Sequence, residues 1–113
     1  MHELSLMDSV LELAVRHAQE RSVTRIHSIT IRIGDMSGVS IDALTFAFDV
    51  LARETMASEA TLNIERVPPR YRCSQCRYEF ASDFPYATCP ECGKERAELI
   101  QGREIELASM EVS

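Results

Sequence analysis

The chain has 113 residues, and its 18 acidic and 12 basic side chains give a formal net charge of −6. Apolar residues make up 45% and charged residues 27% of the chain, a balance typical of a small globular protein rather than a disordered one. Nucleic-acid binding depends on lysine and arginine side chains that meet phosphates, so this acidic balance disfavours nucleic acid as a partner.

The start of the chain shows no targeting signal. Residues 1–8 have neither a basic region nor an apolar stretch, and the most apolar window, residues 43–52, is short and interrupted by Thr45 and Asp49. We therefore expect no secretory signal, no membrane insertion and a cytoplasmic location. In a reducing compartment, paired thiols are more often metal ligands than disulfides.

The first half of the chain predicts a helix, a strand and a second helix. Residues 4–18 carry apolar side chains mostly three or four positions apart, which is typical of an amphipathic helix, and Ser5 is its expected N-cap. In residues 25–33, isoleucines alternate with polar residues and predict a half-buried strand. After a turn at residues 34–38, Ser40 is the expected cap of the second helix, whose apolar stripe is Ile41, Leu44, Ala47, Phe48 and Leu51.

The second half predicts two more strands around a cysteine-bearing segment. Residues 61–67 alternate like a strand, and Pro68 and Pro69 end it because neither can donate a hydrogen bond to a sheet. Residues 103–112 alternate again, and so short a strand must join the sheet of the first unit. The pattern therefore predicts an α+β fold with a cysteine lobe inserted before the last strand.

The four cysteines form two C-x-x-C knuckles separated by twelve residues. Two such tight turns bring four thiolates to one point, which suits tetrahedral zinc. We expect Phe80, Phe84 and Tyr86 to give this small lobe its core. Because the protein supplies all four ligands, the zinc is interpreted as structural rather than catalytic; iron, disulfides and a redox dithiol are the alternatives. The predicted zinc ligands are Cys73, Cys76, Cys89 and Cys92.

The first three residues offer a second set of donor atoms. The amine of Met1, the imidazole of His2 and the backbone amides of His2 and Glu3 are four nitrogens in one short stretch, and square-planar nitrogen geometry suits Ni(II) or Cu(II). The competing interpretation is a loose chain end that binds no metal. His17 is interpreted as a partly solvated surface residue and His27 as a structural one. None of the three histidines pairs visibly with a nucleophile, so no enzyme is predicted.

Several stretches, in order along essentially the whole chain, resemble the HypA/HybF family of nickel metallochaperones for [NiFe]-hydrogenase maturation. They are residues 1–5 (MHELS), residues 34–39 (GDMSGV) with residues 43–48 (ALTFAF), the two knuckles with Cys-Pro-x-Cys-Gly, and residues 100–104 (IQGRE) through 110–112 (MEV). The Met-His-Glu start combined with a four-cysteine lobe is specific, whereas neither feature alone would be.

The resemblance implies two helices packed on a small three-stranded mixed sheet, with an inserted zinc-ribbon-like lobe. Residues 1–67 would form a nickel-binding α/β domain, completed by a C-terminal strand in residues 99–113, and residues 68–98 the zinc lobe. Nickel would be held by Met1, His2 and Glu3. One departure is Ser40, where many relatives carry an acidic residue; Asp35 or Asp42 could take over the role of that acid.

The resemblance also implies a function without catalysis. The chain would carry Ni(II) as transferred cargo, with structural Zn(II), and deliver the nickel to [NiFe]-hydrogenase. Its partners would be a nickel-handling maturation GTPase and the hydrogenase large-subunit precursor, with urease supplied in some relatives; a homodimer is left open. The alternatives are a zinc-ribbon module for protein or RNA interaction without nickel transfer and, as a third class, a thiol redox enzyme.

Overall fold

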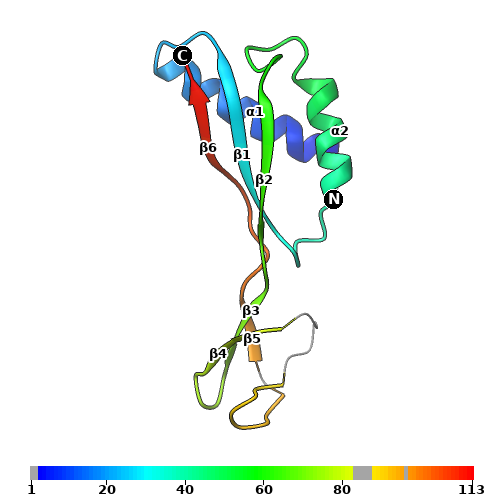
Figure 1. Ribbon diagram of the computed structural model, residues 1–113, viewed down its shortest axis with the longest axis vertical. Coiled ribbons are helices and arrows are strands. Elements are labelled where there is room, and N and C mark those ends of the chain that lie inside the picture. Colours follow the sequence, from blue (N-terminus) through cyan, green and yellow to red (C-terminus); the bar gives the residue numbers. More distant parts are fainter. Residues whose placement is uncertain (1–2, 83–87, 96) are drawn as a thin grey trace.

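The structure, a computed structural model of residues 1–113, describes residues 3–82, 88–95 and 97–113. It is elongated, 54 × 26 × 17 Å, with both helices and one sheet at one end and a second sheet at the other (Figure 1). The elements along the chain are α1 (Glu3–Glu20), β1 (Ile26–Gly34), α2 (Ile41–Leu51), β2 (Thr61–Val67), β3 (Arg70–Cys73), β4 (Glu79–Ala81), β5 (Ala97–Gln101) and β6 (Ile105–Val112). The predicted α+β fold class is confirmed.

The first sheet is mixed, as expected. Its strand order is β2-β1-β6, with β1 parallel to β2 and antiparallel to β6. Strand β1 is central because the chain returns to it twice, first through α2 and β2 and again at its very end. Ile29, Ile31 and Ile33 of β1 are at most 1% exposed and form one core with the buried faces of both helices. The prediction that the isoleucines of this strand face the core, made from the alternation of apolar and polar residues, is therefore confirmed.

One of the two predicted helix caps is confirmed and the other is wrong. Ser40 caps α2, since its Oγ accepts a hydrogen bond from the amide of Ala43 at 3.2 Å. Ser5 does not cap α1, because this helix already begins at Glu3 and Ser5 lies inside its first turns. Glu3 places an acidic side chain in the first turn of α1, where the helix dipole favours negative charge. No helix of the described residues has the length and hydropathy that crossing a bilayer requires.

The second sheet holds the cysteine lobe. Its strand order is β4-β3-β5, and both pairings are antiparallel. Phe80 is only 9% exposed and packs with Tyr71, so its predicted place in the lobe's core is confirmed; Phe84 and Tyr86 lie outside the described residues. Residues 97–101 pair with β3 in this second sheet, and the last strand of the first sheet begins at Ile105. The domain boundaries given above stay a prediction.

The two sheets meet at a close approach between two glycines. The amide of Gly34 donates to the carbonyl of Glu104 at 2.7 Å, and the amide of Met36 donates to the carbonyl of Gly102 at 2.7 Å. A Cβ atom on Gly34 would lie 2.0 Å from the carbonyl oxygen of Gly102, so no larger residue fits there without backbone movement. This junction fixes where the cysteine lobe leaves the first sheet.

Candidate metal centres

The sulfur atoms of Cys73, Cys76, Cys89 and Cys92 all lie within 4.8 Å of one another. The distance is 3.4 Å between the Sγ atoms of Cys73 and Cys92, and 3.5 Å between those of Cys76 and Cys89. Both are far longer than a disulfide bond of about 2.05 Å, and the four cysteines are free thiols. Four sulfurs at about 2.3 Å from a tetrahedral zinc would be about 3.8 Å apart, so the cluster has the size of a zinc site.

The two knuckles have the same backbone structure. In each, the residue after the second cysteine has a positive φ angle, +67° at Arg77 and +73° at Gly93. The amides of these two residues donate to the carbonyls of Cys73 and Cys89, at 3.0 and 2.9 Å respectively. Each turn is thereby closed on its first cysteine, and both sulfurs of a knuckle face the same point. The resulting arrangement holds four ligands from two separate chain segments.

The thiols influence one another's protonation. The pKa of Cys73 is lowered to about 6, chiefly because the backbone N–H of Cys76 donates to its sulfur. The amide of Tyr78 favours the thiolate of Cys76, but desolvation and the neighbouring thiols outweigh it and raise the pKa of Cys76 to about 12. The amide of Lys94 favours the thiolate of Cys92, but the Cys73 thiol, desolvation and the Cys89 thiol together outweigh it and raise the pKa of Cys92 as well. Four thiolates so close together call for a cation, and a divalent metal supplies that charge.

A small core supports the cysteines from one side. The rings of Tyr71 and Phe80 stack with centroids 5.9 Å apart, and the first cysteine of each knuckle is buried against them, Cys73 at 0% and Cys89 at 1% exposure. The second cysteine of each knuckle is exposed. Sequence reasoning missed Tyr71 as a core residue, although its alternation with Cys73 in residues 70–73 was a usable signal.

At the other end of the molecule, Met1 and His2 lie outside the described residues, so of the three predicted nickel ligands only Glu3 has a described position. Its side-chain Oε2 accepts a hydrogen bond from the backbone amide of Ser40 at 2.9 Å. This contact joins the first turn of α1 to the N-cap of α2 across 37 positions of sequence. The start of α1 is therefore fixed to the start of α2.

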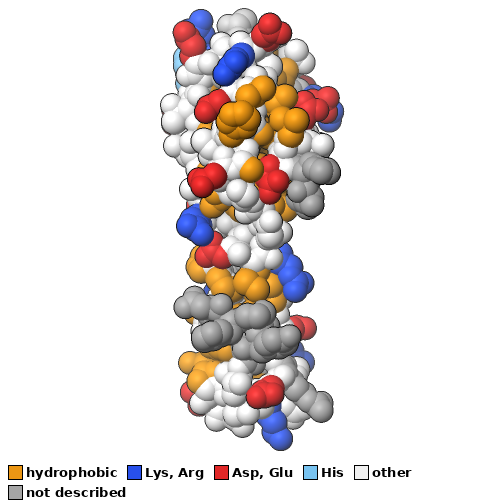
Figure 2. Space-filling model, turned by 90° about the vertical axis from the view of Figure 1, so that its right-hand side faces the viewer, with side chains coloured by type: hydrophobic (Ala, Val, Ile, Leu, Met, Phe, Trp, Pro, Cys, Tyr) orange, Lys and Arg blue, Asp and Glu red, His pale blue; other side chains and the backbone are white. Residues whose placement is uncertain are grey.

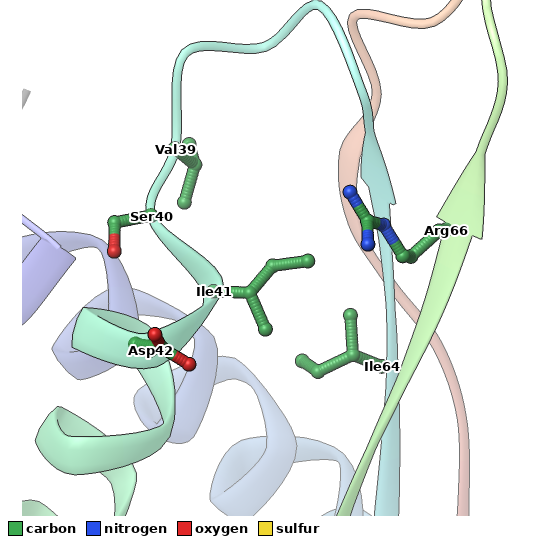
Figure 3. Close-up of a pocket in the computed structure, with 6 residues that line it drawn as sticks. All are labelled: Val39, Ser40, Ile41, Asp42, Ile64 and Arg66. Carbon is green, nitrogen blue, oxygen red and sulfur yellow. The ribbon is translucent and has the colours of Figure 1, made fainter.

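The resemblance offered Asp35 and Asp42 as substitutes for an acidic residue at position 40, and their surroundings in the structure differ. Asp35 is engaged, since its Oδ1 lies 3.2 Å from Nε of Arg66. Asp42 is in the first turn of α2 and takes part in no salt bridge among the described residues. It lines a pocket of about 380 Å³ in which Ile41 points toward Ile64, whereas the Ser40 hydroxyl points to the opposite side (Figure 3). Asp42 is thus the unpaired carboxylate beside Ser40.

The two described histidines both lie at the surface. His17 lies in the last turn of α1, where the helix dipole favours a cation, and is exposed. His27 is also exposed, and its Nε2 lies 2.6 Å from the hydroxyl oxygen of Ser113 at the end of the chain. Within the described part of the chain, the four cysteines alone form a group of three or more side chains able to hold a metal ion.

The described residues form a small two-sheet protein whose four cysteines are grouped closely enough to hold a metal ion. A family model described as "Hydrogenase/urease nickel incorporation, metallochaperone, hypA" matches residues 1–112. Relatives named "Hydrogenase maturation factor HypA" are 41% identical over 112 residues in Synechococcus sp. and 36% identical over 112 residues in Rhizobium leguminosarum bv. viciae. In both, 99% of this chain and 99% of the relative are covered.

Two solved structures have the same fold. The solution structure of the Ni metallochaperone HypA from Helicobacter pylori superposes with a TM-score of 0.72 at 26% identity, covering 99% of this chain and 97% of that one. A second structure, "Solution structure of HypA protein", gives a TM-score of 0.78 at 26% identity, covering 100% of this chain and 97% of that one. The chain belongs to the HypA family, as the sequence resemblance predicted. The family description and the Helicobacter pylori structure both name nickel, and the relatives are named as hydrogenase maturation factors; the four cysteines of this chain form a group able to hold a metal ion.

Proposed function

We propose that this chain binds Ni(II) at its N-terminus and delivers it for [NiFe]-hydrogenase maturation, without catalysing a reaction itself. The proposed nickel ligands are the amine of Met1, the imidazole of His2 and the backbone amides of His2 and Glu3. The proposed zinc ligands are Cys73, Cys76, Cys89 and Cys92, which hold the lobe together. The observation that supports the nickel site most directly is the hydrogen bond from the Ser40 amide to the Glu3 carboxylate, because it fixes the residue that follows the two terminal donors.

The start of a helix suits this chemistry for two reasons. The first amides of a helix have no carbonyl partner within the helix, so their protons are available for displacement by a metal. A dication near a helix N-terminus is otherwise disfavoured by the helix dipole. When Ni(II) displaces two amide protons, its charge of +2 meets two negative nitrogens and the chelate is close to neutral. The unfavourable interaction with the dipole is then small.

Delivery requires that the metal can leave. A planar complex of four nitrogens leaves its two faces open, so a ligand from a partner can reach the metal before the old ligands depart. We propose the maturation GTPase and the hydrogenase large-subunit precursor as the proteins that dock during this exchange. The zinc, enclosed by four protein ligands, takes no part in the transfer.

Native mass spectrometry with nickel and zinc tests the proposal. The wild-type chain should carry one zinc and one nickel, whereas His2→Ala and a chain extended by one residue before Met1 should keep zinc and lose high-affinity nickel. His17→Ala is the matched control, since it removes an exposed histidine from the same helix. It should bind both metals as the wild type does. Nickel retained in the extended chain would contradict the N-terminal site, and zinc without any nickel would favour the interaction-module alternative.

A further inference from the structure

Helix α2 presents an exposed apolar face. Phe46 is 70% exposed and Val50 is 40% exposed, and the two lie one helical turn apart on the side opposite the buried residues Leu44 and Phe48. Phe46 is the most exposed large hydrophobic side chain of the described residues. Figure 2 shows hydrophobic side chains gathered at this end of the molecule, on the side where α2 lies in Figure 1, with acidic side chains around them. Such a patch on a small protein is typical of an interaction site.

The apolar face carries acidic neighbours. Asp42 and Asp49 lie four positions before and three positions after Phe46, which places them on the same side of α2. Both are exposed, and neither takes part in a salt bridge among the residues that the structure describes. The basic residue of this face is Arg53, whose Nε donates to the backbone carbonyl of Asp49 at 3.0 Å beyond the end of the helix.

A groove lies between α1 and α2. It has a volume of about 410 Å³ and passes between the two helices, with Leu51 on the α2 side next to Val50. Its α1 side is lined by the buried Leu11, the half-buried Val15, and the exposed residues Asp8, Glu12 and Arg16. Gln19 and Thr55 complete the lining. The face and the groove together, named here the α2 face, count four acidic residues against two arginines.

We propose that the α2 face docks a helical segment of a partner protein, with apolar residues one turn apart flanked by lysines or arginines. The proposal rests on the proposed function, since a carrier must bind its recipient. A helix laid in a groove between helices is a common mode of recognition, and basic residues on the partner would complement Asp42 and Asp49. A second copy of this chain fits less well, because two-fold pairing brings each acidic residue near acidic residues of the same face. The net charge of −6 on each copy adds to that repulsion.

The probe for this surface is a synthetic amphipathic 14-residue peptide of leucine and lysine, compared with its leucine and glutamate counterpart. Calorimetry and ¹⁵N chemical-shift mapping of the full chain should show that the lysine peptide binds, with shifts confined to α2 and the facing side of α1. Phe46→Ser should weaken this binding at least about tenfold, and the double variant Asp42→Asn, Asp49→Asn should weaken it and reduce its salt dependence. Leu13→Ser, which changes an exposed apolar residue of α1 outside the groove, should bind the peptide like the wild type.

Several results would overturn the docking proposal. They are equal binding of the glutamate peptide, shifts that map to the cysteine lobe, or unchanged affinity in Phe46→Ser. A wild-type dimer that Phe46→Ser dissociates in sedimentation would make a second copy the occupant and would overturn it too. Nickel and zinc contents of Phe46→Ser should match the wild type, while His2→Ala should still bind the lysine peptide. Loss of the nickel function and loss of the docking function are therefore observed separately.

Discussion

Replacement of Glu3 tests how the start of the chain is held. The carboxylate of Glu3 accepts the Ser40 amide at 2.9 Å, at the N-terminus of α2, where the helix dipole favours negative charge. A hydrogen bond to a charged group contributes about 1.5–3 kcal/mol when shielded from water. Because Ser40 is exposed, we expect Glu3→Ala to lower the free energy of unfolding by the smaller amount of about 1–2 kcal/mol. Glu3→Gln keeps an oxygen acceptor of the same reach and should lose about half as much.

Nickel affinity separates two roles of the same residue. If the metal is bound by the backbone amide of Glu3, the side chain acts only by positioning the first turn of α1. Glu3→Gln should then bind nickel within about threefold of the wild type, whereas Glu3→Ala, with its first turn released, should bind about tenfold more weakly. Urea unfolding of the zinc-loaded chain gives the stability, and competition against a chromophoric chelator gives the affinity. Equal, large losses of nickel affinity in both variants would refute the reasoning, because they would make the carboxylate itself a ligand.

Three further predictions concern the junction and the zinc lobe. Gly34→Ala should lower the free energy of unfolding, measured in urea, by about 2–4 kcal/mol. The Cβ atom of the new alanine would lie 2.0 Å from the carbonyl oxygen of Gly102 and would break the hydrogen bonds of the junction. A loss below about 1 kcal/mol would contradict this reasoning. Zinc binding near pH 7.5 should release at least two protons, one each from Cys76 and Cys92, whose raised pKa values keep the metal-free thiols protonated. Calorimetry in two buffers with different ionisation enthalpies measures the number, and fewer than two protons would be incompatible with these pKa values. Gly93→Ala should weaken zinc binding about fivefold to tenfold, measured by competition with a chelator. The backbone φ angle of +73° at this position costs alanine about 1 kcal/mol, although no atom lies within 4 Å of the new Cβ. Unchanged zinc affinity would contradict this prediction, because it would show that the turn adopts another φ angle at no cost.

The part of the fold that depends on local pattern could be predicted from sequence. Alternating isoleucines at positions 29, 31 and 33 defined the inner face of β1, and a serine before an apolar stripe defined the cap of α2. The cysteine cluster was predictable for the same reason, because two C-x-x-C turns determine their own local geometry. The face of β1, the cap of α2 and the turn of each C-x-x-C knuckle are determined by residues close in sequence, and the structure contains all three.

The features that sequence did not reveal depend on distant residues or on very short elements. Strand β4 has three residues, too few for alternation to be recognised, and the second sheet exists because β3 pairs with it on one side and with β5 on the other. The hydrogen bond between Glu3 and Ser40 joins two helix starts 37 positions apart, and no local pattern indicates it. The prediction that Ser5 caps α1 was wrong because α1 begins at Glu3. So near the start of the chain, the sequence pattern does not distinguish a serine inside the first turn of a helix from a serine that caps it.

The proposed function requires one small protein to keep two metals apart, and the donor atoms of the two proposed sites differ in a way that would do so. The four cysteines saturate a tetrahedral ion, so a metal bound there has no vacant position through which a partner could take it. Among the described residues, the four cysteines are the group of cysteine, histidine or acidic side chains that could hold an ion. In the proposed nickel site, backbone nitrogens beside a histidine would be the donors, and they would select against zinc because their planar geometry is one that zinc does not favour. If nickel is bound as proposed, separation by donor type and geometry, rather than by distance alone, would let the cargo exchange while the lobe stays folded.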